Sequence, residues 1–216
     1  NAVKAAKADV VCVGFDKSDA IMGLIEDGFI LATMAQNPDV MGYEGVKAAV
    51  AALKGENLGG AVTDTGVSVL KASASAAAAP AEVTANGNYK IALITMDSID
   101  QHWITLKEGA EKVAKDLGVD LVFMAPNTKD DAQQIEQVNN AVASGCQAII
   151  VAANGPDAIS SALKEAESAG VKIVYVDSPA NVPAEATFST DNTAAGKTAG
   201  ETMLKALTDK GVTSGK

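Results

Sequence analysis

The chain has 216 residues, with 17 basic against 27 acidic side chains, one His, two Cys and 48% hydrophobic residues. This composition is typical of a globular chain of one or two domains, and it excludes a disordered chain, a collagen and a disulfide scaffold. Every basic residue is Lys and the net charge is -10, so nucleic acid and anionic membrane surfaces are not expected partners. No apolar run reaches the roughly 18 to 20 residues of a membrane span, and the first seven residues lack the pattern of a signal peptide.

The first 71 residues predict strands that alternate with helices. Asn37-Pro38-Asp39 is a helix start with Pro in the first turn, and Gly28 closes the helix before it. In chain order the expected elements are a helix end at 1–6, a strand at 10–15, a helix at 18–25, a strand at 30–35, a helix to about 53 and an extended segment at 61–70.

Residues 72–89 differ in composition from the segments on either side. They are rich in Ala and Ser and nearly uncharged, and Pro80 with Asn86-Gly87-Asn88 would interrupt a long helix. The segment is therefore interpreted as a flexible linker.

Residues 90–211 repeat short apolar runs followed by stretches with helical period, which is typical of βαβ units around a parallel sheet. Glycines end three of the helices. Strands are expected at 90–96, 119–124, 148–153, 172–176 and 186–189, and helices at 103–117, 130–144, 157–169 and 193–207. The predicted fold class is α/β, with helices on both faces of a parallel sheet.

Five separated motifs resemble one family, the type I periplasmic solute-binding proteins of sugar ABC importers, in particular their ribose-binding-like branch. They are VGFD at 13–16, ATMAQNPDVMG at 32–42, KIALITMDSIDQHWITLKEG at 90–109, Asp177 after KIVYV, and STDNTAAG at 189–196. The resemblance implies two Rossmann-like lobes that close on a ligand.

The motifs stand in a different order from that of the family, so the chain resembles a circular permutant or a piece of a tandem copy. By this resemblance, residues 90–211 form the core of the first lobe, 37–71 supply a helix and strand that return to it, and 212–216 begin a crossover. Residues 1–36 are then a partial second lobe. Its uncovered apolar faces predict a homodimer or strand exchange with a second chain.

Ligands of parallel sheets bind beyond the carboxyl ends of the strands, where polar residues are therefore candidates. The resemblance implies ligand contacts for Asp100, His102 and Trp103 in the loop after the first strand of 90–211, with the two rings flanking a sugar. The alternative interpretation is that Trp103 is a core residue at the start of a helix. For His102 the alternative is a surface or hydrogen-bonded histidine of the loop.

Three further positions follow other strands of the same sheet. Asp177 is implied as an acceptor from sugar hydroxyls, and otherwise forms a turn before Ser178-Pro179. Ser178 stands where the family often has Arg, which puts ribose itself in doubt. Asn154, which follows the strand 148–153, is a further candidate for ligand contact. A turn residue before Gly155-Pro156 is an interpretation of Asn154 that is at least as good.

In the partial lobe, Asp16 and Gln36 each end a strand and match sugar-contacting positions of the family. Asp16 could instead cap the helix that begins near Ser18, and Gln36 could be a hinge residue.

The resemblance implies an extracytoplasmic binding protein, periplasmic or tethered as a lipoprotein, that captures a monosaccharide or small polyol for an ABC permease. No cofactor, metal or enzymatic activity is expected, because no catalytic spacing, Walker A motif or GxGxxG follows a strand. The alternatives are the ligand-sensing core of a LacI-type regulator and a chemoreceptor or quorum-signal binding protein.

Overall fold

Two units make up the chain, and each is assembled from separated segments. The computed structural model describes residue 5 and residues 10–72 and 88–212. The smaller unit comprises residues 1–37, 66–79 and 190–216, and the larger unit comprises 38–65 and 80–189. Within the described residues the chain therefore passes from one unit to the other after Asn37, Thr65 and Ser189.

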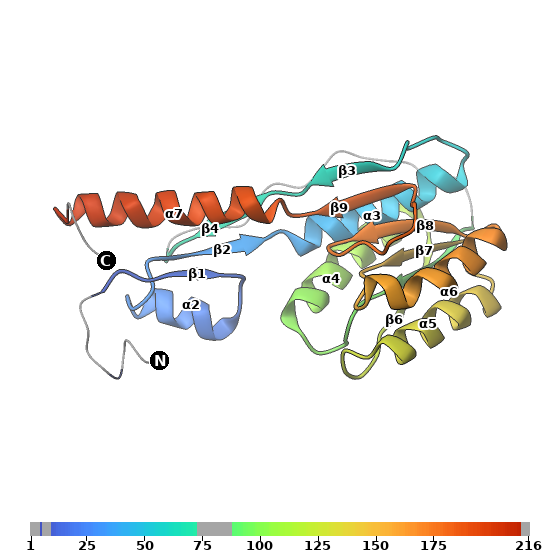
Figure 1. Cartoon of the computed structure of the whole chain (residues 1–216), viewed down its shortest axis with the longest axis horizontal. Helices are drawn as coiled ribbons and strands as arrows, with labels where there is room; N and C mark the ends of the chain where they lie inside the picture. Colours follow the sequence, from blue (N-terminus) through green and yellow to red (C-terminus); the bar gives the residue numbers. More distant parts are fainter. Residues whose placement is uncertain (1–4, 6–9, 73–87, 213–216) are drawn as a thin grey trace. The chain divides into compact units, whose positions relative to one another are not determined.

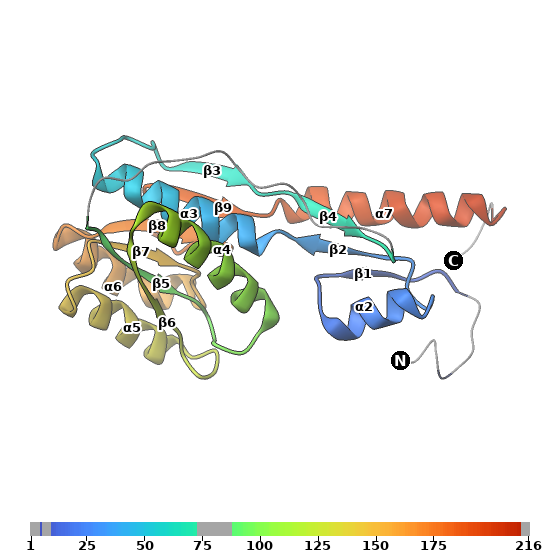
Figure 2. The same ribbon diagram turned by 180° about the vertical axis from the view of Figure 1, so that it is seen from behind.

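A six-stranded, fully parallel sheet forms the centre of the larger unit (Figures 1 and 2). Strand β7 in its middle is apolar throughout and all of its residues are buried, as expected for a strand with both faces covered. The strand order is β3 (Ala61–Asp64), β9 (Ala186–Ser189), β8 (Lys172–Val176), β7 (Ala148–Val151), β5 (Lys90–Ile94) and β6 (Asp120–Met124).

Two pairs of helices cover this sheet. Helices α3 (Pro38–Leu53) and α4 (Gln101–Leu117) share one apolar core with one set of strand side chains, and α5 (Asp131–Ala143) and α6 (Pro156–Ser168) share a second core with the alternate set. In β5, Ile91 and Leu93 belong to the first core, and Ala92 and Ile94 to the second. This alternation follows from the two-residue period of a strand.

Helices α3 and α4 touch through glycines. A Cβ at Gly42 would lie 2.0 Å from the carbonyl oxygen of Leu106, and a Cβ at Gly109 would lie 2.0 Å from that of Asp39. Only glycine permits this approach of two backbones, which brings α3 against α4 although the two helices are far apart in the sequence.

The smaller unit has a three-stranded sheet in the order β1 (Val13–Phe15), β2 (Ala32–Gln36) and β4 (Val67–Leu70). Strands β1 and β2 are parallel, and β4 is antiparallel to β2. Helices α2 (Asp19–Glu26) and α7 (Asn192–Asp209) lie on opposite sides of this sheet in both views (Figures 1 and 2).

The predicted α/β class is confirmed, and the strands 172–176 and 186–189 have the predicted bounds. The extended segment 61–70 is not one strand. Gly66, with a φ of 72°, interrupts it, so that β3 pairs with β9 in the larger unit and β4 pairs with β2 in the smaller unit.

The structure also differs in the placement of 190–211, which the sequence analysis assigned to the first lobe. Helix α7 contacts β1 and β2 and belongs to the smaller unit. The sequence pattern showed the helix but not its packing partner. Three expected segments lie outside the described residues except at a few positions: the helix end at 1–6, the linker at 72–89 and the crossover at 212–216. Of these segments the structure describes only residues 5, 72, 88, 89 and 212.

None of the helices in the described segments is both long enough and apolar enough to cross a membrane.

We expect Gly42→Ala and Gly109→Ala to destabilise the larger unit by about 1 to 3 kcal/mol each, because the added methyl group must push two backbones apart. Urea unfolding monitored by circular dichroism measures this change. Glu108→Ala is the matched control, since this side chain is exposed on the same helix. Its effect should stay within about 0.5 kcal/mol. Equal stability of all three variants would show that the glycine contact is not tight.

Candidate functional site

Two aspartates adopt a backbone conformation that non-glycine residues seldom adopt. Among the described residues, the non-glycine positions with positive φ are Asp16, at 62°, and Asp177, at 60°. Each comes directly after a strand of its unit, β1 or β8. Aspartate tolerates this left-handed region better than most residues, yet strained backbone concentrates at functional sites. The backbone thus singles out two of the residues that the sequence analysis named.

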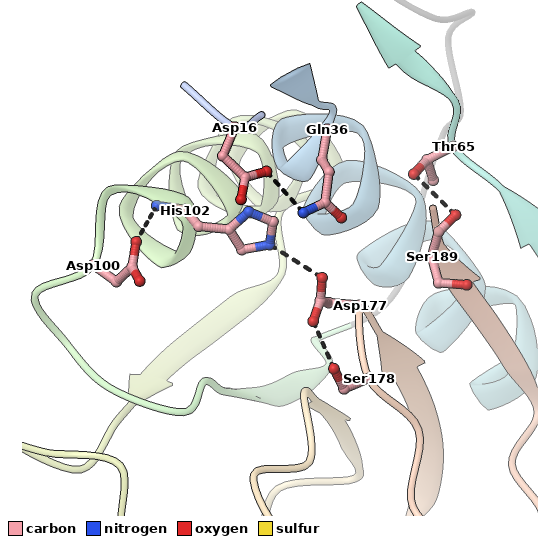
Figure 3. Close-up of polar contacts among 8 residues, drawn as sticks. All are labelled: Asp16, Gln36, Thr65, Asp100, His102, Asp177, Ser178 and Ser189. Carbon is pink, nitrogen blue, oxygen red and sulfur yellow. Dashed lines mark hydrogen bonds and ion pairs between the residues drawn. The ribbon is translucent and has the colours of Figure 1, made fainter. Parts of the chain in front are cut away.

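Asp177 is held from two sides in the larger unit (Figure 3). The hydroxyl of Ser178 donates to its Oδ2 at 2.7 Å, and Nε2 of His102 lies 3.3 Å from its Oδ1, within ion-pair distance but not aligned as a hydrogen bond. The side chains of His102 and Asp177 are 17% and 20% exposed. The carboxylate is therefore fixed in direction, while part of it stays accessible.

The surroundings of Asp177 favour its charged form. Burial alone would raise the pKa of this carboxyl group, but the nearby imidazole of His102, the hydrogen bond from the Ser178 hydroxyl and the charge of Lys129 outweigh burial, so that its pKa is lowered. A half-buried group that stays ionised is a strong acceptor for hydroxyl donors.

The turn that follows β5 positions His102. The carboxylate of Asp97 is 4% exposed, and its Oδ1 accepts from the backbone nitrogens of Ile99 and Asp100. Asp100 is the N-cap of α4 and accepts from the backbone nitrogen of His102 at 3.0 Å. These contacts place His102 in the first turn of α4, where its ring can reach Asp177. Asp97 was missed as a site residue, although its place at the end of a buried strand was a usable signal.

Trp103 is placed differently from the expected stacking surface. Its side chain is 4% exposed and belongs to the core beneath α3 and α4, because the large apolar ring gains more from burial there. It meets the ring of His102 edge to face, with centroids 4.7 Å apart. Its indole nitrogen is buried without a hydrogen-bond partner. In this structure Trp103 is a core residue whose ring packs against that of His102, which agrees with the core alternative of the sequence analysis.

Asn154, after β7, is tied to α5. Its amide nitrogen donates to the carboxylate of Asp131, and its backbone nitrogen donates to Oε1 of Gln134 at 2.9 Å. Gln134 is buried and also donates to the carbonyl oxygens of Thr95 and Ala152. These bonds tie the turn at Asn154 to α5. Gln134 was missed, and its signal was a polar residue on the apolar face of the predicted helix.

In the smaller unit the structure brings Asp16 and Gln36 together. Oδ1 of Asp16 accepts from Nε2 of Gln36 at 2.9 Å, and the carbonyl oxygen of Asp16 accepts from the hydroxyl of Thr33 at 2.7 Å (Figure 3 shows the first of these). The capping alternative for Asp16 is wrong, because the side chain of Ser18 caps α2. Asp16 and Gln36 form a polar pair at adjacent strand ends.

A metal centre is not indicated by the described part of the chain, where no three His, Cys, Asp or Glu side chains cluster as ligands.

A family model described as a periplasmic binding protein domain matches residues 91–216, more than half of the chain. The chain belongs to the periplasmic binding protein family. The fold is that of its type I sugar-binding members. Among curated relatives, the ribose import binding protein RbsB of Escherichia coli is 29% identical over 134 residues, which are 61% of this chain and 45% of that protein.

Three solved structures of periplasmic binding proteins are similar to this chain. A sugar-binding protein of a sugar ABC transporter from Bacillus halodurans is 28% identical with a TM-score of 0.53, over 56% of this chain and 42% of that chain. One from Legionella pneumophila is 30% identical with a TM-score of 0.52, over 56% and 46%. A solute-binding protein from Clostridium phytofermentas with bound L-rhamnose is 25% identical with a TM-score of 0.50, over 57% and 38%. The chain thus spans less than half the length of these proteins.

The lowered pKa of Asp177 predicts a loss of stability in acid. Its carboxylate contributes stability above the pKa of an unfolded Asp, about 3.9, and loses that contribution as the pH falls through the lower pKa of the folded state. The free energy of unfolding of wild type should therefore exceed that of Asp177→Asn at pH 7, and the difference should shrink below about pH 4.

Urea unfolding at a series of pH values measures this difference. Asn tolerates positive φ as Asp does, so the variant leaves backbone strain unchanged. Asp116→Asn, exposed on α4, is the control and should show no comparable convergence. A constant difference between wild type and Asp177→Asn from neutral to acid pH would contradict the assignment.

Proposed function

We propose that the chain binds a neutral monosaccharide or small polyol at the carboxyl edge of the larger unit's sheet, with the carboxylate of Asp177 as the principal acceptor. The observation that carries this proposal is the constrained state of Asp177: positive φ, two oriented neighbours and a pKa held low at the end of a parallel strand. Periplasmic binding proteins of this chain's family provide the class of ligand.

The chemistry of the site suits hydroxyl groups. A sugar presents several O–H donors, and an ionised carboxylate accepts more than one of them, while the hydroxyl of Ser178 can both donate and accept. Hydrogen bonds to charged groups contribute about 1.5 to 3 kcal/mol each. A micromolar site needs about 8 kcal/mol, so Asp177 must act with several neighbours.

Charge argues against an anionic ligand. Asp97, Asp100 and Asp177 all lie on the turns that follow β5 and β8, and the chain contains no Arg to bind a carboxylate or phosphate in two bonds. A sugar acid or sugar phosphate would meet like charge there. The neutral sugars named with the relatives, ribose and L-rhamnose, would not.

In the smaller unit we propose that Asp16 and Gln36 are sugar-contacting residues. Their mutual hydrogen bond leaves further acceptor positions on the carboxylate and the amide oxygen. The positive φ of Asp16, like that of Asp177, is typical of a functional position and supports this proposal.

For the whole protein we propose periplasmic or lipoprotein-tethered localisation and delivery of the sugar to the permease of an ABC importer, without enzymatic activity. The names of the relatives support this proposal, because they describe import and solute-binding proteins. The carboxylate of Asp177 offers an acceptor for hydroxyl groups, which suits capture of a sugar.

Isothermal titration calorimetry with a panel of D-ribose, L-rhamnose, other pentoses and hexoses, and polyols tests the proposal. We expect at least one neutral sugar to bind, and Asp177→Asn to weaken its binding at least about tenfold, which corresponds to 1.4 kcal/mol. Asp116→Asn should bind as wild type does. Absence of binding across the panel, or unchanged affinity of Asp177→Asn for a sugar that binds, would contradict the proposal.

A further inference from the structure

Gln134 is a buried polar residue on the inner side of α5. It shares this side of the helix with Val138, and its own side chain is 1% exposed. Burial of an amide group costs free energy unless its polar atoms find hydrogen-bond partners. The partners of Gln134 are main-chain groups of Thr95, Ala152 and Asn154, which follow β5 and β7. One side chain therefore joins the carboxyl ends of two neighbouring strands.

The pairing of β5 with β7 ends at Ile94 and Val151. Just beyond this pair, the backbone nitrogen of Ala152 donates to the carbonyl oxygen of Ile94 at 3.0 Å. If the parallel ladder continued, Met96 would make the next two bonds. Its backbone nitrogen would donate to the carbonyl oxygen of Ala152, and its carbonyl oxygen would accept from the backbone nitrogen of Asn154. The chain instead bends at Met96.

The side chain of Gln134 makes the two bonds that Met96 would have made. Its Nε2 donates to the carbonyl oxygen of Ala152 at 2.8 Å, and its Oε1 accepts from the backbone nitrogen of Asn154 at 2.9 Å. Nε2 also donates to the carbonyl oxygen of Thr95 at 3.1 Å. A side-chain amide thus replaces a backbone amide in the ladder. Because the partners in β7 are already satisfied, the chain after Thr95 is free to leave the sheet.

This replacement occurs where ligands of parallel sheets bind. Helix α4 follows β5 and α6 follows β7, and the two helices cover opposite faces of the sheet. Neighbouring strands whose helices turn to opposite faces form the switch point of an open parallel sheet, and ligands bind outside the carboxyl ends of the strands there. Gln134 therefore ends the pairing of β5 with β7 at the switch point.

A series of hydrogen bonds leads from Thr95 to the candidate site. The hydroxyl of Thr95 is buried and donates to the carbonyl oxygen of Asp97 at 2.8 Å. The carboxylate of Asp97 accepts from the backbone nitrogen of Asp100, and the carboxylate of Asp100 accepts from that of His102. His102 in turn lies beside Asp177 (Figure 3). A displaced Thr95 would therefore move the turn that carries the imidazole.

We propose that Gln134 is a positioning residue of the candidate site: it takes over the ladder bonds of Met96, ends the pairing of β5 with β7, and so holds the turn that presents His102 to Asp177. The effect on the position of His102 follows from these contacts alone. The effect on sugar affinity rests on the proposed function.

Proton–nitrogen NMR of the His102 ring, recorded without sugar, tests the proposal. Gln134→Met keeps the length of the side chain and removes its hydrogen-bonding atoms. Its His102 signals should shift or split, because the turn is no longer fixed at Thr95. Thr95→Val breaks the next bond of the series with little change in shape, and it should displace the same signals. Since both variants act on one series of bonds, their effects in the double variant should not add.

Tyr175→Phe is the matched control. The hydroxyl of Tyr175 lies in the core that α5 shares with the sheet and donates to the carbonyl oxygen of Val182 at 3.1 Å, in the segment before β9. Like Thr95→Val, this variant loses one buried hydrogen bond, so its urea midpoint should fall. Its His102 signals should keep their wild-type positions. Circular dichroism shows whether each variant is folded.

Isothermal titration calorimetry with a sugar that wild type binds measures the consequence for affinity. Gln134→Met should raise the dissociation constant at least about tenfold, because the imidazole no longer orients Asp177. Tyr175→Phe should bind the sugar as wild type does.

Wild-type His102 signals in folded Gln134→Met, or equal displacement in Tyr175→Phe, would overturn the proposal. If Gln134→Met does not fold, Thr95→Val decides, and unmoved signals in that variant overturn the proposal likewise. Displaced His102 signals in a protein that binds no sugar would contradict the proposed function and support the positioning role. Sugar binding by wild type, with unmoved His102 signals in both variants, would support the proposed function and contradict the positioning role.

Discussion

The larger unit depends on the close contact of α3 and α4 at Gly42, which meets Leu106, and at Gly109, which meets Asp39. Because neither residue has a side chain, the backbones of α3 and α4 meet directly, and residues that are distant in the sequence close one face of the sheet. Helix α3 also contacts β7, β8 and β9, and Gly45 brings it close to Val176 and Ile150. The core sealed in this way holds Trp103. The ring of His102 packs edge-on against Trp103, so the helix contact ultimately sets the position of the imidazole beside Asp177.

The site itself combines rigidity with stored strain. Asp177 is in a left-handed conformation, and two neighbours orient its carboxylate. In the proposed function the carboxylate of Asp177 is oriented before a sugar binds, and a preorganised acceptor loses little conformational entropy on binding. Ser178 takes part in this orientation, because its hydroxyl donates to Oδ2 of Asp177. A guanidinium at the same place would compete for the carboxylate and would favour an anionic ligand. The residue after Asp177 therefore bears directly on the charge of the ligand.

Much of the fold was predictable because apolar runs and glycine stops report secondary structure directly, as the correct bounds of β8 and β9 show. The strands and helices against which each element packs were harder to predict. The segment 61–70 divides at Gly66 between two sheets, and α7 packs on β1 and β2, because strand pairing and packing depend on distant residues. For the candidate site, the ends of strands singled out Asp177 and Asp16, the two described non-glycine residues with positive φ. Burial of Trp103 and the ties of Asn154 to α5 could not be read from the sequence, since both roles come from tertiary contacts.

The central claim is that a sugar binds at Asp177 beside His102. Because His102 is the only histidine of the chain, its ring nitrogens give a single set of signals in proton–nitrogen NMR. During titration with a sugar that binds by calorimetry, these signals should shift saturably with the same midpoint, and the shift should vanish in Asp177→Asn. Full binding with unmoved His102 signals would place the ligand elsewhere and contradict the account.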